Sequence, residues 1–174
     1  MIITKTERLI LRHFQTSDQE VLKRLFSDSD VMQFSMGVKS SSETAAWLQQ
    51  RISGYELQPS LGLFAVVLKS TNEVIGYCGF SEFKDIEGRP EIEIGYRFLQ
   101  QHWGKGYATE AALFVQQYGF EQLNISRLVS LIDPGNLASI RVAQKTGMTF
   151  EKEVMMEGYT HPDHLYVIQK EVGG

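Results

Sequence analysis

The chain has 174 residues, of which 43% are hydrophobic and 11% aromatic, enough to fill the core of a single domain over residues 1–174. A formal net charge of -4 excludes a general electrostatic attraction to nucleic acid or anionic lipid, both of which reward clustered Lys and Arg. The expected partner is therefore a small molecule, or a neutral to basic peptide or protein.

The cysteine content and the N-terminal residues bear on where the protein works. The single cysteine, Cys78, cannot form an internal disulfide, and its apolar strand predicts a buried thiol rather than a nucleophile. Residues 1–8 carry charges where a signal peptide has its apolar core. Because no run approaches the roughly 20 apolar residues that cross a bilayer, we expect a cytoplasmic monomer or homodimer with no membrane partner.

Hydrophobic periodicity predicts strands and helices in the first half of the chain. Period-two patterns indicate strands, and apolar residues three or four apart indicate helices. Two of the strands flank a polar segment at 69–73, which is typical of an antiparallel hairpin. The predicted elements are, in chain order, a strand at 6–14, a helix after the capping-box pattern Ser17-x-x-Glu20, a helix at 42–52 and strands at 62–68 and 74–83.

The second half begins with the most informative strand. Between Glu91 and Phe98, apolar and polar residues alternate, so that one face is apolar and the other carries Glu91 and Glu93. This order of elements predicts an α/β (α+β) domain, with a mixed, mostly antiparallel sheet flanked by helices and parallel pairing near a central glycine turn. After that turn, the predicted elements are a helix at 109–123, a strand at 127–132, a helix at 138–146 that ends at Gly147, and strands at 149–156 and 164–171.

Gly104 and Gly106 lie in the turn between that strand and the next helix. A helix N-terminus presents unpaired backbone N–H groups and a partial positive charge, and glycine lets the backbone approach a phosphate closely. A tight turn without a ligand explains the same glycines, so this pattern alone leaves both interpretations open. A Walker A loop is excluded because Lys105 lies between the glycines, and a dinucleotide fingerprint because Thr109 stands where its third glycine belongs.

Five segments together resemble the GNAT acetyltransferase superfamily over nearly the whole chain. The family's pyrophosphate loop has Arg or Gln, two residues, Gly, one residue, then Gly or Ala, and Gln101-His102-Trp103-Gly104-Lys105-Gly106 matches each fixed position. Within the superfamily the chain is most similar to the Rim-type branch, named for acetyltransferases of ribosomal-protein N-termini. The other matching segments are Thr6-Glu7-Arg8-Leu9-Ile10-Leu11-Arg12, Glu93-Ile94-Gly95-Tyr96, Asn136-Leu137-Ala138-Ser139 and Lys145-Thr146-Gly147-Met148.

The resemblance implies an acetyl-CoA-dependent N-acetyltransferase that binds its cosubstrate between two diverging strands. Backbone amides of the glycine turn would hold the pyrophosphate, and backbone at the end of the preceding strand would pair with the pantetheine amides. Asn136 would hydrogen-bond the pantetheine arm, and Lys145 or Arg141 would reach the adenosine phosphate unless both are only surface charges. The implied cofactor-binding residues are Phe98, Leu99, Gln101, Trp103, Gly104, Lys105, Gly106, Tyr107, Ala108, Thr109, Asn136, Ser139 and Lys145.

Acetyl transfer needs a neutral amine, stabilisation of a tetrahedral oxyanion and a proton for the departing thiolate. The family fold implies strands that part near residue 98 and leave backbone N–H groups facing the acetyl oxygen. Glu93 is the first candidate base; a straight strand would place it roughly 17 Å from Phe98, so it would act through water or position the substrate, and a solvent-facing or ion-paired glutamate is the alternative. The resemblance makes Glu157 the second candidate base. The candidate proton donors are Ser139, Tyr107 and Tyr96, the last of which lies on the apolar face and fits a core position.

The acceptor site is the least determined part of the prediction. Residues 33–37 and the loop at 157–164 are expected to shape it. His161 and His164 suggest a metal pair, but Pro162 argues against a helix that aligns them and no third ligand is evident, so no metal is expected. The Rim-type resemblance predicts a protein or peptide N-terminal α-amine as acceptor. The alternatives are a small-molecule amine such as a polyamine, amino acid or antibiotic, and a non-catalytic acyl-CoA-binding regulatory module.

Overall fold

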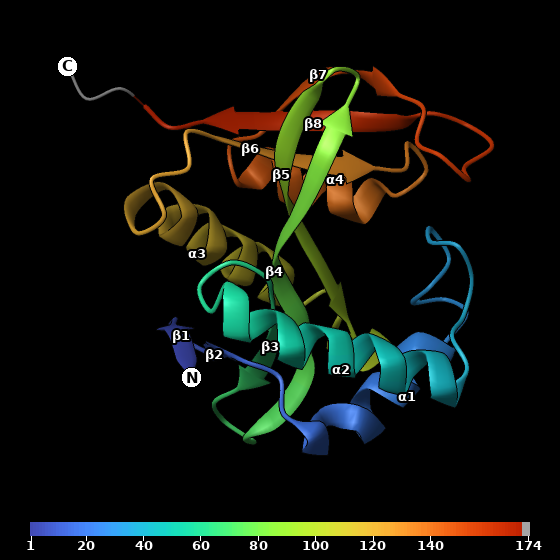
Figure 1. Ribbon diagram of the computed structural model, residues 1–174, viewed down its shortest axis with the longest axis vertical. Coiled ribbons are helices and arrows are strands. Elements are labelled where there is room, and N and C mark those ends of the chain that lie inside the picture. The colour runs from blue at the N-terminus through green and yellow to red at the C-terminus, as the bar shows by residue number, and fades with distance from the viewer. Residues whose placement is uncertain (172–174) are drawn as a thin grey trace.

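A computed structural model of the chain describes residues 1–171, and one eight-stranded sheet runs through it (Figure 1). The strands follow the spatial order β1-β2-β3-β4-β5-β6-β8-β7. All neighbouring strands are antiparallel except β5 and β6, which confirms the predicted mixed, mostly antiparallel sheet. The strands are β1 (Ile2–Lys5), β2 (Leu9–Arg12), β3 (Leu63–Leu68), β4 (Glu73–Ile86), β5 (Arg89–Phe98), β6 (Arg127–Ile132), β7 (Thr149–Val154) and β8 (Asp163–Gln169).

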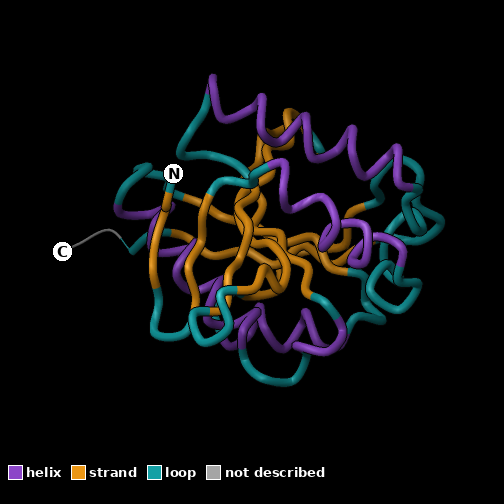
Figure 2. The backbone as a smooth tube through the Cα atoms, turned by 90° about the horizontal axis from the view of Figure 1, so that it is seen from below, coloured by secondary structure: helices purple, strands orange, loops and turns teal. Residues whose placement is uncertain are grey.

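Helices lie on both sides of the strands, as the view from below in Figure 2 shows. Alternate residues of β3 serve the two layers: Phe64 and Val66 join the apolar cluster that includes α3, whereas Leu63 and Ala65 join the cluster that includes α1 and α2. β3 is buried at all of its positions, which explains its continuous apolar sequence. The helices are α1 (Gln19–Ser27), α2 (Ser41–Leu57), α3 (Tyr107–Glu121) and α4 (Leu137–Lys145), with 3₁₀ turns at Thr16–Asp18 and Gln100–His102.

The capping box predicted at Ser17 and Glu20 is wrong, because the intervening Asp18 makes the decisive contacts. Asp18 is buried, and its carboxylate accepts hydrogen bonds from the Arg12 guanidinium (2.8 and 2.9 Å) and from the backbone N–H of Gln15 (2.8 Å). A capping box therefore forms around the 3₁₀ turn, and α1 begins at Gln19, one residue later than the pattern suggests. The consequence is that an ion pair ties the start of α1 to the end of β2.

The predicted strand at 6–14 is confirmed in part as β2, but the structure has a further strand, β1, which precedes it and was not predicted. β1 pairs antiparallel with β2 across a tight turn in which the N–H of Thr6 donates to the Leu9 carbonyl (2.9 Å). The sequence misses β1 because the strand is short and lies at the sheet edge, where its residues are exposed or half-buried and its apolar pattern is weak. Within residues 1–171, no helix combines the length and apolar character needed to span a bilayer.

Candidate active site

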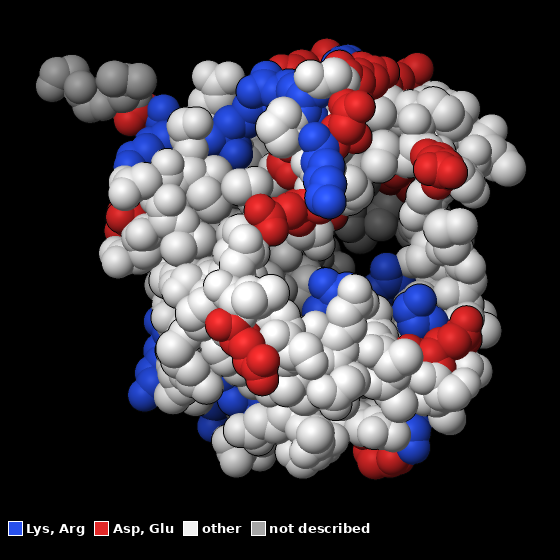
Figure 3. Space-filling view, viewed as in Figure 1, with Lys and Arg blue, Asp and Glu red and all other residues white. Residues whose placement is uncertain are grey.

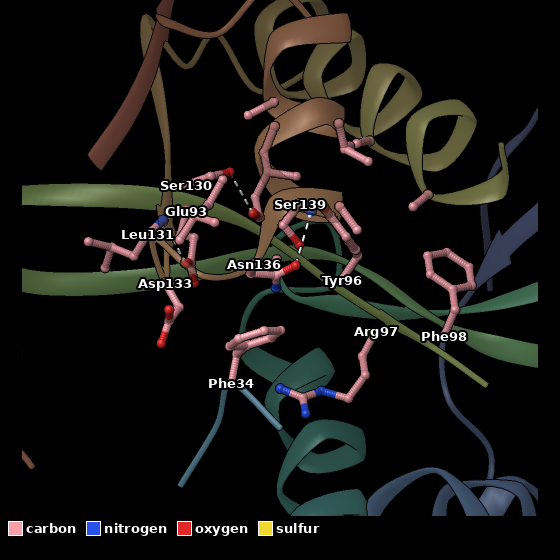
Figure 4. A pocket seen from close by; sticks show the side chains of 18 of the residues that line it. Phe34, Glu93, Tyr96, Arg97, Phe98, Ser130, Leu131, Asp133, Asn136 and Ser139 are labelled. Atoms are coloured by element: carbon pink, nitrogen blue, oxygen red, sulfur yellow. Dashed lines mark hydrogen bonds between the residues drawn. The ribbon is translucent and has the colours of Figure 1, made fainter. Parts of the chain in front are cut away.

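A cavity of about 690 Å³ opens where β5 and β6 separate, and Figure 3 shows a hollow in this region of the molecule. Its volume lies within the range typical of small-molecule sites. The walls come from the second half of β5, the glycine turn with the start of α3, the end of β6, α4, and the loops that precede α2 and β8. Figure 4 shows side chains from these elements converging on the space between the strands.

The separation of the two parallel strands begins directly after Glu93. β5 pairs with β6 at Glu93, opposite Val129, and the Ser130 hydroxyl then donates to the Ile94 carbonyl (2.9 Å). Beyond this point β6 does not follow β5 within residues 1–171. The far half of β5 therefore presents an open backbone edge, and the strands part directly after Ile94 and not near residue 98.

The register between β5 and β4 determines which backbone groups lie on that open edge. The N–H of Leu99 donates to the Ile75 carbonyl (2.9 Å), so Leu99 belongs to a hydrogen-bonded pair and Tyr96 and Phe98 to non-hydrogen-bonded pairs. The backbone groups of Tyr96 and Phe98 consequently point away from β4, and the Phe98 carbonyl accepts from the Trp103 indole (2.9 Å). The structure contradicts the role predicted for Leu99, whose N–H is taken and which does not line the cavity. Tyr96 and the N–H of Phe98 are the groups available to a pantetheine arm.

Both glycines of the turn between β5 and α3 have the left-handed backbone conformation that favours glycine. Gly104 and Gly106 have positive φ angles of +72° and +80°, a region that residues with a Cβ rarely adopt. Gly106 directly precedes α3, and no side chain within residues 1–171 caps this helix. The N–H groups of residues 107–109 are thus left without helical partners at the cavity wall, where they and the helix dipole favour an anion.

Arg8 holds this turn from the other side. Its Nη1 donates to the Lys105 carbonyl (2.9 Å), and its Nε donates to Glu110 in the first turn of α3 (2.6 Å). The Glu110 carboxylate also accepts from the Arg8 backbone N–H (2.8 Å) and from the Thr6 hydroxyl (2.5 Å). The β1–β2 turn therefore fixes the orientation of the anion-binding helix start.

The predicted loop residues divide into two groups in the structure. Gln101 and Lys105 are exposed and do not line the cavity, which leaves them no side-chain role at its wall. The structure brings the others to the wall, namely Trp103, Gly104, Gly106, Tyr107, Ala108 and Thr109.

α4 supplies the opposite wall. The Asn136 Oδ1 caps the helix by accepting from the Ser139 N–H (3.1 Å), so only the amide N–H₂ of this side chain is left to donate to a ligand. Asn136, Ser139, Arg141 and Lys145 all line the cavity. The two cations lie further along α4 than the cap, as an adenosine phosphate site on this helix would require.

Glu93 lies at the fork of the two strands, and Figure 4 shows its side chain beside Leu131. Its Oε1 accepts from the Leu131 N–H (3.2 Å), a β6 donor that would otherwise have paired with β5. Burial raises the pKa of Glu93 to about 7, although the Leu131 hydrogen bond lowers it. A carboxylate with a pKa near neutrality, on the wall of a cavity, has the property expected of a general base.

Tyr96 packs against the main apolar cluster, as its place on the apolar face predicted, and it also lines the cavity, beside Ser139 (Figure 4). Burial raises the pKa of the Tyr96 hydroxyl above its usual value, which keeps it protonated and able to donate. Glu157, the second candidate base, is exposed and does not line the cavity. Met156 and Tyr159 reach the wall on either side of it.

Two loops border one end of the cavity, which we call the acceptor end: residues 31–35, before α2, and residues 156–163, before β8. Arg97 ties the first loop to β5 by donating to the Ser35 hydroxyl (2.6 Å) and the Val31 carbonyl (3.2 Å). The second loop meets the turn after β6, where His161 Nε2 lies 2.7 Å from Asp133 Oδ2. Both predicted loops thus reach the cavity.

Comparison with known proteins identifies the family. The family model described as "Acetyltransferase (GNAT) domain" matches residues 8–149. The chain belongs to the GNAT acetyltransferase family. It is 40% identical over 153 residues to uncharacterized protein YkkB of Bacillus subtilis, with 86% of each chain covered. The crystal structure of a GNAT-family acetyltransferase from Bacillus anthracis is similar with a TM-score of 0.83 at 30% identity, covering 97% of this chain and 98% of the other.

A ribosomal L7/L12 alpha-N-protein acetyltransferase in complex with coenzyme A is similar with a TM-score of 0.78, covering 97% of this chain and 98% of the other. At 21% identity, that likeness concerns the GNAT fold alone. By its family membership the chain is an acetyl-CoA-dependent N-acetyltransferase with acetyl-CoA as cosubstrate, and the glycine turn lies within the residues that the family model matches.

Several residues contribute to this GNAT site in ways that no local sequence pattern shows. Arg8, Arg97 and Leu131 act through long-range contacts with the turn, the 31–35 loop and Glu93. Asp133 and Asp163 lie at the acceptor end, but in the sequence they read as a turn residue and a loop residue. The turn at residues 133–136 directly follows the strand at 127–132, and the glycine turn follows the strand at 91–98. Because the carboxyl ends of parallel strands meet at one edge of a sheet, this arrangement could have placed Asp133 near the glycine turn.

Proposed function

We propose that the chain transfers acetyl directly from acetyl-CoA to a primary amine, with Glu93 as the general base. The observation that carries this proposal is the Glu93 carboxylate at the fork of β5 and β6, held by the Leu131 N–H and with a pKa raised by burial to about 7. A base with this pKa is about half ionised at neutral pH and accepts a proton readily. Although Glu93 precedes Phe98 by several residues along β5, both residues line the same cavity.

The reaction follows from the groups on the cavity walls. The neutral amine attacks the thioester carbonyl carbon while Glu93 accepts its proton directly or through one water. Backbone N–H groups on the open edge of β5 face the developing oxyanion, as a preorganised donor should. The C–S bond then breaks, and the departing thiolate takes a proton from the Tyr96 hydroxyl, which Ser139 adjoins. The products are the amide and free CoA, and no covalent enzyme intermediate is needed.

The contacts across the acceptor end favour a slender acceptor. A Cβ built on Gly158 would lie 2.9 Å from the Met36 terminal methyl, and one built on Gly135 would lie 3.4 Å from the Phe34 ring. The loop before α2 therefore touches both the turn after β6 and the loop before β8. An extended peptide N-terminus, as the Rim-type resemblance predicts, and a small alkylamine both fit this description, whereas a folded surface does not.

The direct test is amine-dependent release of CoA, measured with butylamine and with an unstructured peptide that has a free N-terminus. Glu93→Gln should lower kcat/KM for butylamine by about 100- to 10,000-fold, the usual worth of a general base. The loss on the peptide should be smaller, because an α-amine with a pKa near 7.7 to 8.0 is already about one-tenth neutral at pH 7.

Two further variants control this test. Glu56→Gln removes an exposed carboxylate on α2 and should leave kcat/KM unchanged for both butylamine and the peptide. Glu157→Gln should behave like Glu56→Gln if Glu93 is the base, and a large loss in Glu157→Gln alone would contradict the assignment. Acetyl-CoA binding without CoA release for any amine would instead support the non-catalytic module.

A further inference from the structure

We propose that the acceptor end of the cavity binds a second positively charged group of the substrate, through Asp163 and Asp133, so that the preferred acceptor is a diamine-like molecule. This inference rests on the proposed transfer to a primary amine and names the class of amine. The reacting nitrogen belongs near Glu93, and the second ammonium group belongs at the cluster formed by Asp133, His161 and Asp163.

The cluster brings together side chains from three places in the chain. Asp133 follows β6, His161 belongs to the loop before β8, and Asp163 is the first residue of β8. One ligand-type atom from each of the three lies within 4.8 Å of the others. Asp133 and Asp163 also line the cavity that contains Glu93, so the cluster and the base share one space.

Asp163 supplies the independent evidence that a ligand belongs here. Asp163 is only 7% exposed, and its Oδ1 is buried without a hydrogen-bond partner within residues 1–171. A buried carboxylate oxygen that lacks a partner is costly, and native structures rarely keep one without a ligand, ion or water. Burial raises the pKa of Asp163, with the nearby Asp133 acting in the same direction, so a bound cation would relieve both effects.

The distribution of charge along the cavity explains why the cation is a second group and not the reacting amine. The basic side chains Arg141 and Lys145 lie along α4, and the Arg97 guanidinium is occupied by the loop before α2. The carboxylates gather at the other side, where the His161 imidazole contacts Asp133. The attacking nitrogen must be neutral, so it cannot neutralise Asp163, whereas a second ammonium group remains charged throughout the reaction.

The occupant is an organic cation rather than a metal ion in this proposal. The cluster offers three ligand groups, and one of them, the Asp133 carboxylate, already accepts from or pairs with His161. The Phe34 ring lines the same end and adds aromatic surface, against which a methylene chain packs. A short alkyl chain with an amine at each end matches both features.

The test compares butane-1,4-diamine with butylamine, which has the same carbon chain and lacks the second ammonium group. The wild-type enzyme should acetylate the diamine with a kcat/KM about 10- to 100-fold higher, as expected for a charge-assisted contact in a partly desolvated site. Asp163→Asn should remove most of that preference by raising KM for the diamine, so that the ratio of kcat/KM for the diamine to kcat/KM for butylamine falls by about tenfold or more. Asp133→Asn should act in the same direction, and Glu56→Gln should retain the full preference.

The outcomes separate this inference from the proposed function. If Asp163→Asn and Asp133→Asn both fold, as judged by their melting curves, and keep the diamine preference, the second-cation site is refuted while acetyl transfer stands. A peptide N-terminus that exceeds the diamine in kcat/KM also refutes it. Tight calorimetric binding of Mn²⁺ that Asp163→Asn abolishes would assign the cluster to a metal ion and refute it. Failure of the wild-type enzyme to acetylate any amine would refute the proposed function itself.

Discussion

The raised pKa of Glu93 predicts a specific dependence of folding stability on pH, which can be measured without any substrate. An acid whose folded-state pKa lies above its unfolded value is protonated more strongly in the folded protein. The stability that this protonation contributes is fully present below about pH 4.5, the ordinary pKa, and is lost as pH rises through about 7. The gap between these values corresponds to about 3 kcal/mol, an upper limit because the cavity admits water.

Glu93→Gln provides the matched comparison. The glutamine carbonyl can still accept from the Leu131 N–H, and the amide stays neutral at every pH, so the penalty for a buried charge disappears. The free energy of unfolding of the variant, relative to wild type, should therefore increase between pH 4.5 and pH 8 by as much as about 3 kcal/mol. Other titrating groups are present in both proteins, and their contributions largely cancel in the difference.

Urea unfolding followed by circular dichroism at several pH values, with Glu56→Gln as control, would give this difference. Glu56→Gln should differ from wild type by a constant amount across the range. If the difference between Glu93→Gln and wild type is also constant, Glu93 titrates at its ordinary pKa, and the argument that the fork of β5 and β6 tunes a general base is refuted.

Three further predictions concern the cofactor wall and the fold. Gly106→Val should abolish acetyl-CoA binding in calorimetry, whereas Gly88→Val, at an equally positive φ with open space around it, should bind normally; equal binding by both would remove the anion-site argument. Asn136→Ala should lose about 0.5 to 2 kcal/mol of stability from the α4 cap and weaken acetyl-CoA by about 0.5 to 1.5 kcal/mol; unchanged affinity would make Asn136 only a cap. Glu91→Gln should lower the unfolding free energy by about 1 to 3 kcal/mol, because it weakens a buried contact with Arg127, and an unchanged urea midpoint would contradict this.

Most of the fold could be predicted from the sequence, because its elements have strong local signals. The strand at 127–132 and the helix after it have the bounds that apolar periodicity and Gly147 predict, within a residue. β1 and the cap that precedes α1 could not be predicted in this way. β1 depends on pairing with β2 at the sheet edge, and the cap depends on the ion pair of Asp18 with Arg12.

The parts of the site that depend on local backbone geometry could be predicted from the sequence. The parts that depend on tertiary contacts could not. Gly104 and Gly106 have positive φ angles, which the turn requires and which favour glycine, so these two residues mark the turn in the sequence. The period-two alternation placed Glu93 on a polar face, but its near-neutral pKa depends on burial at the fork, which no local pattern shows. The strand alternation could have excluded Leu99, since a residue that pairs with β4 cannot also face the cleft.

The pH dependence of kcat/KM for butylamine tests the central claim, that Glu93 is the base for acetyl transfer, most directly. Below about pH 7 both the base and the amine gain reactivity as protons leave, so kcat/KM should rise with the inverse square of proton concentration. Above that pH Glu93 is ionised, and the rise should follow the first inverse power until the amine titrates near about 10.4. Glu93→Gln should show the first-power dependence throughout. A change of slope near pH 7 that persists in Glu93→Gln would contradict the account.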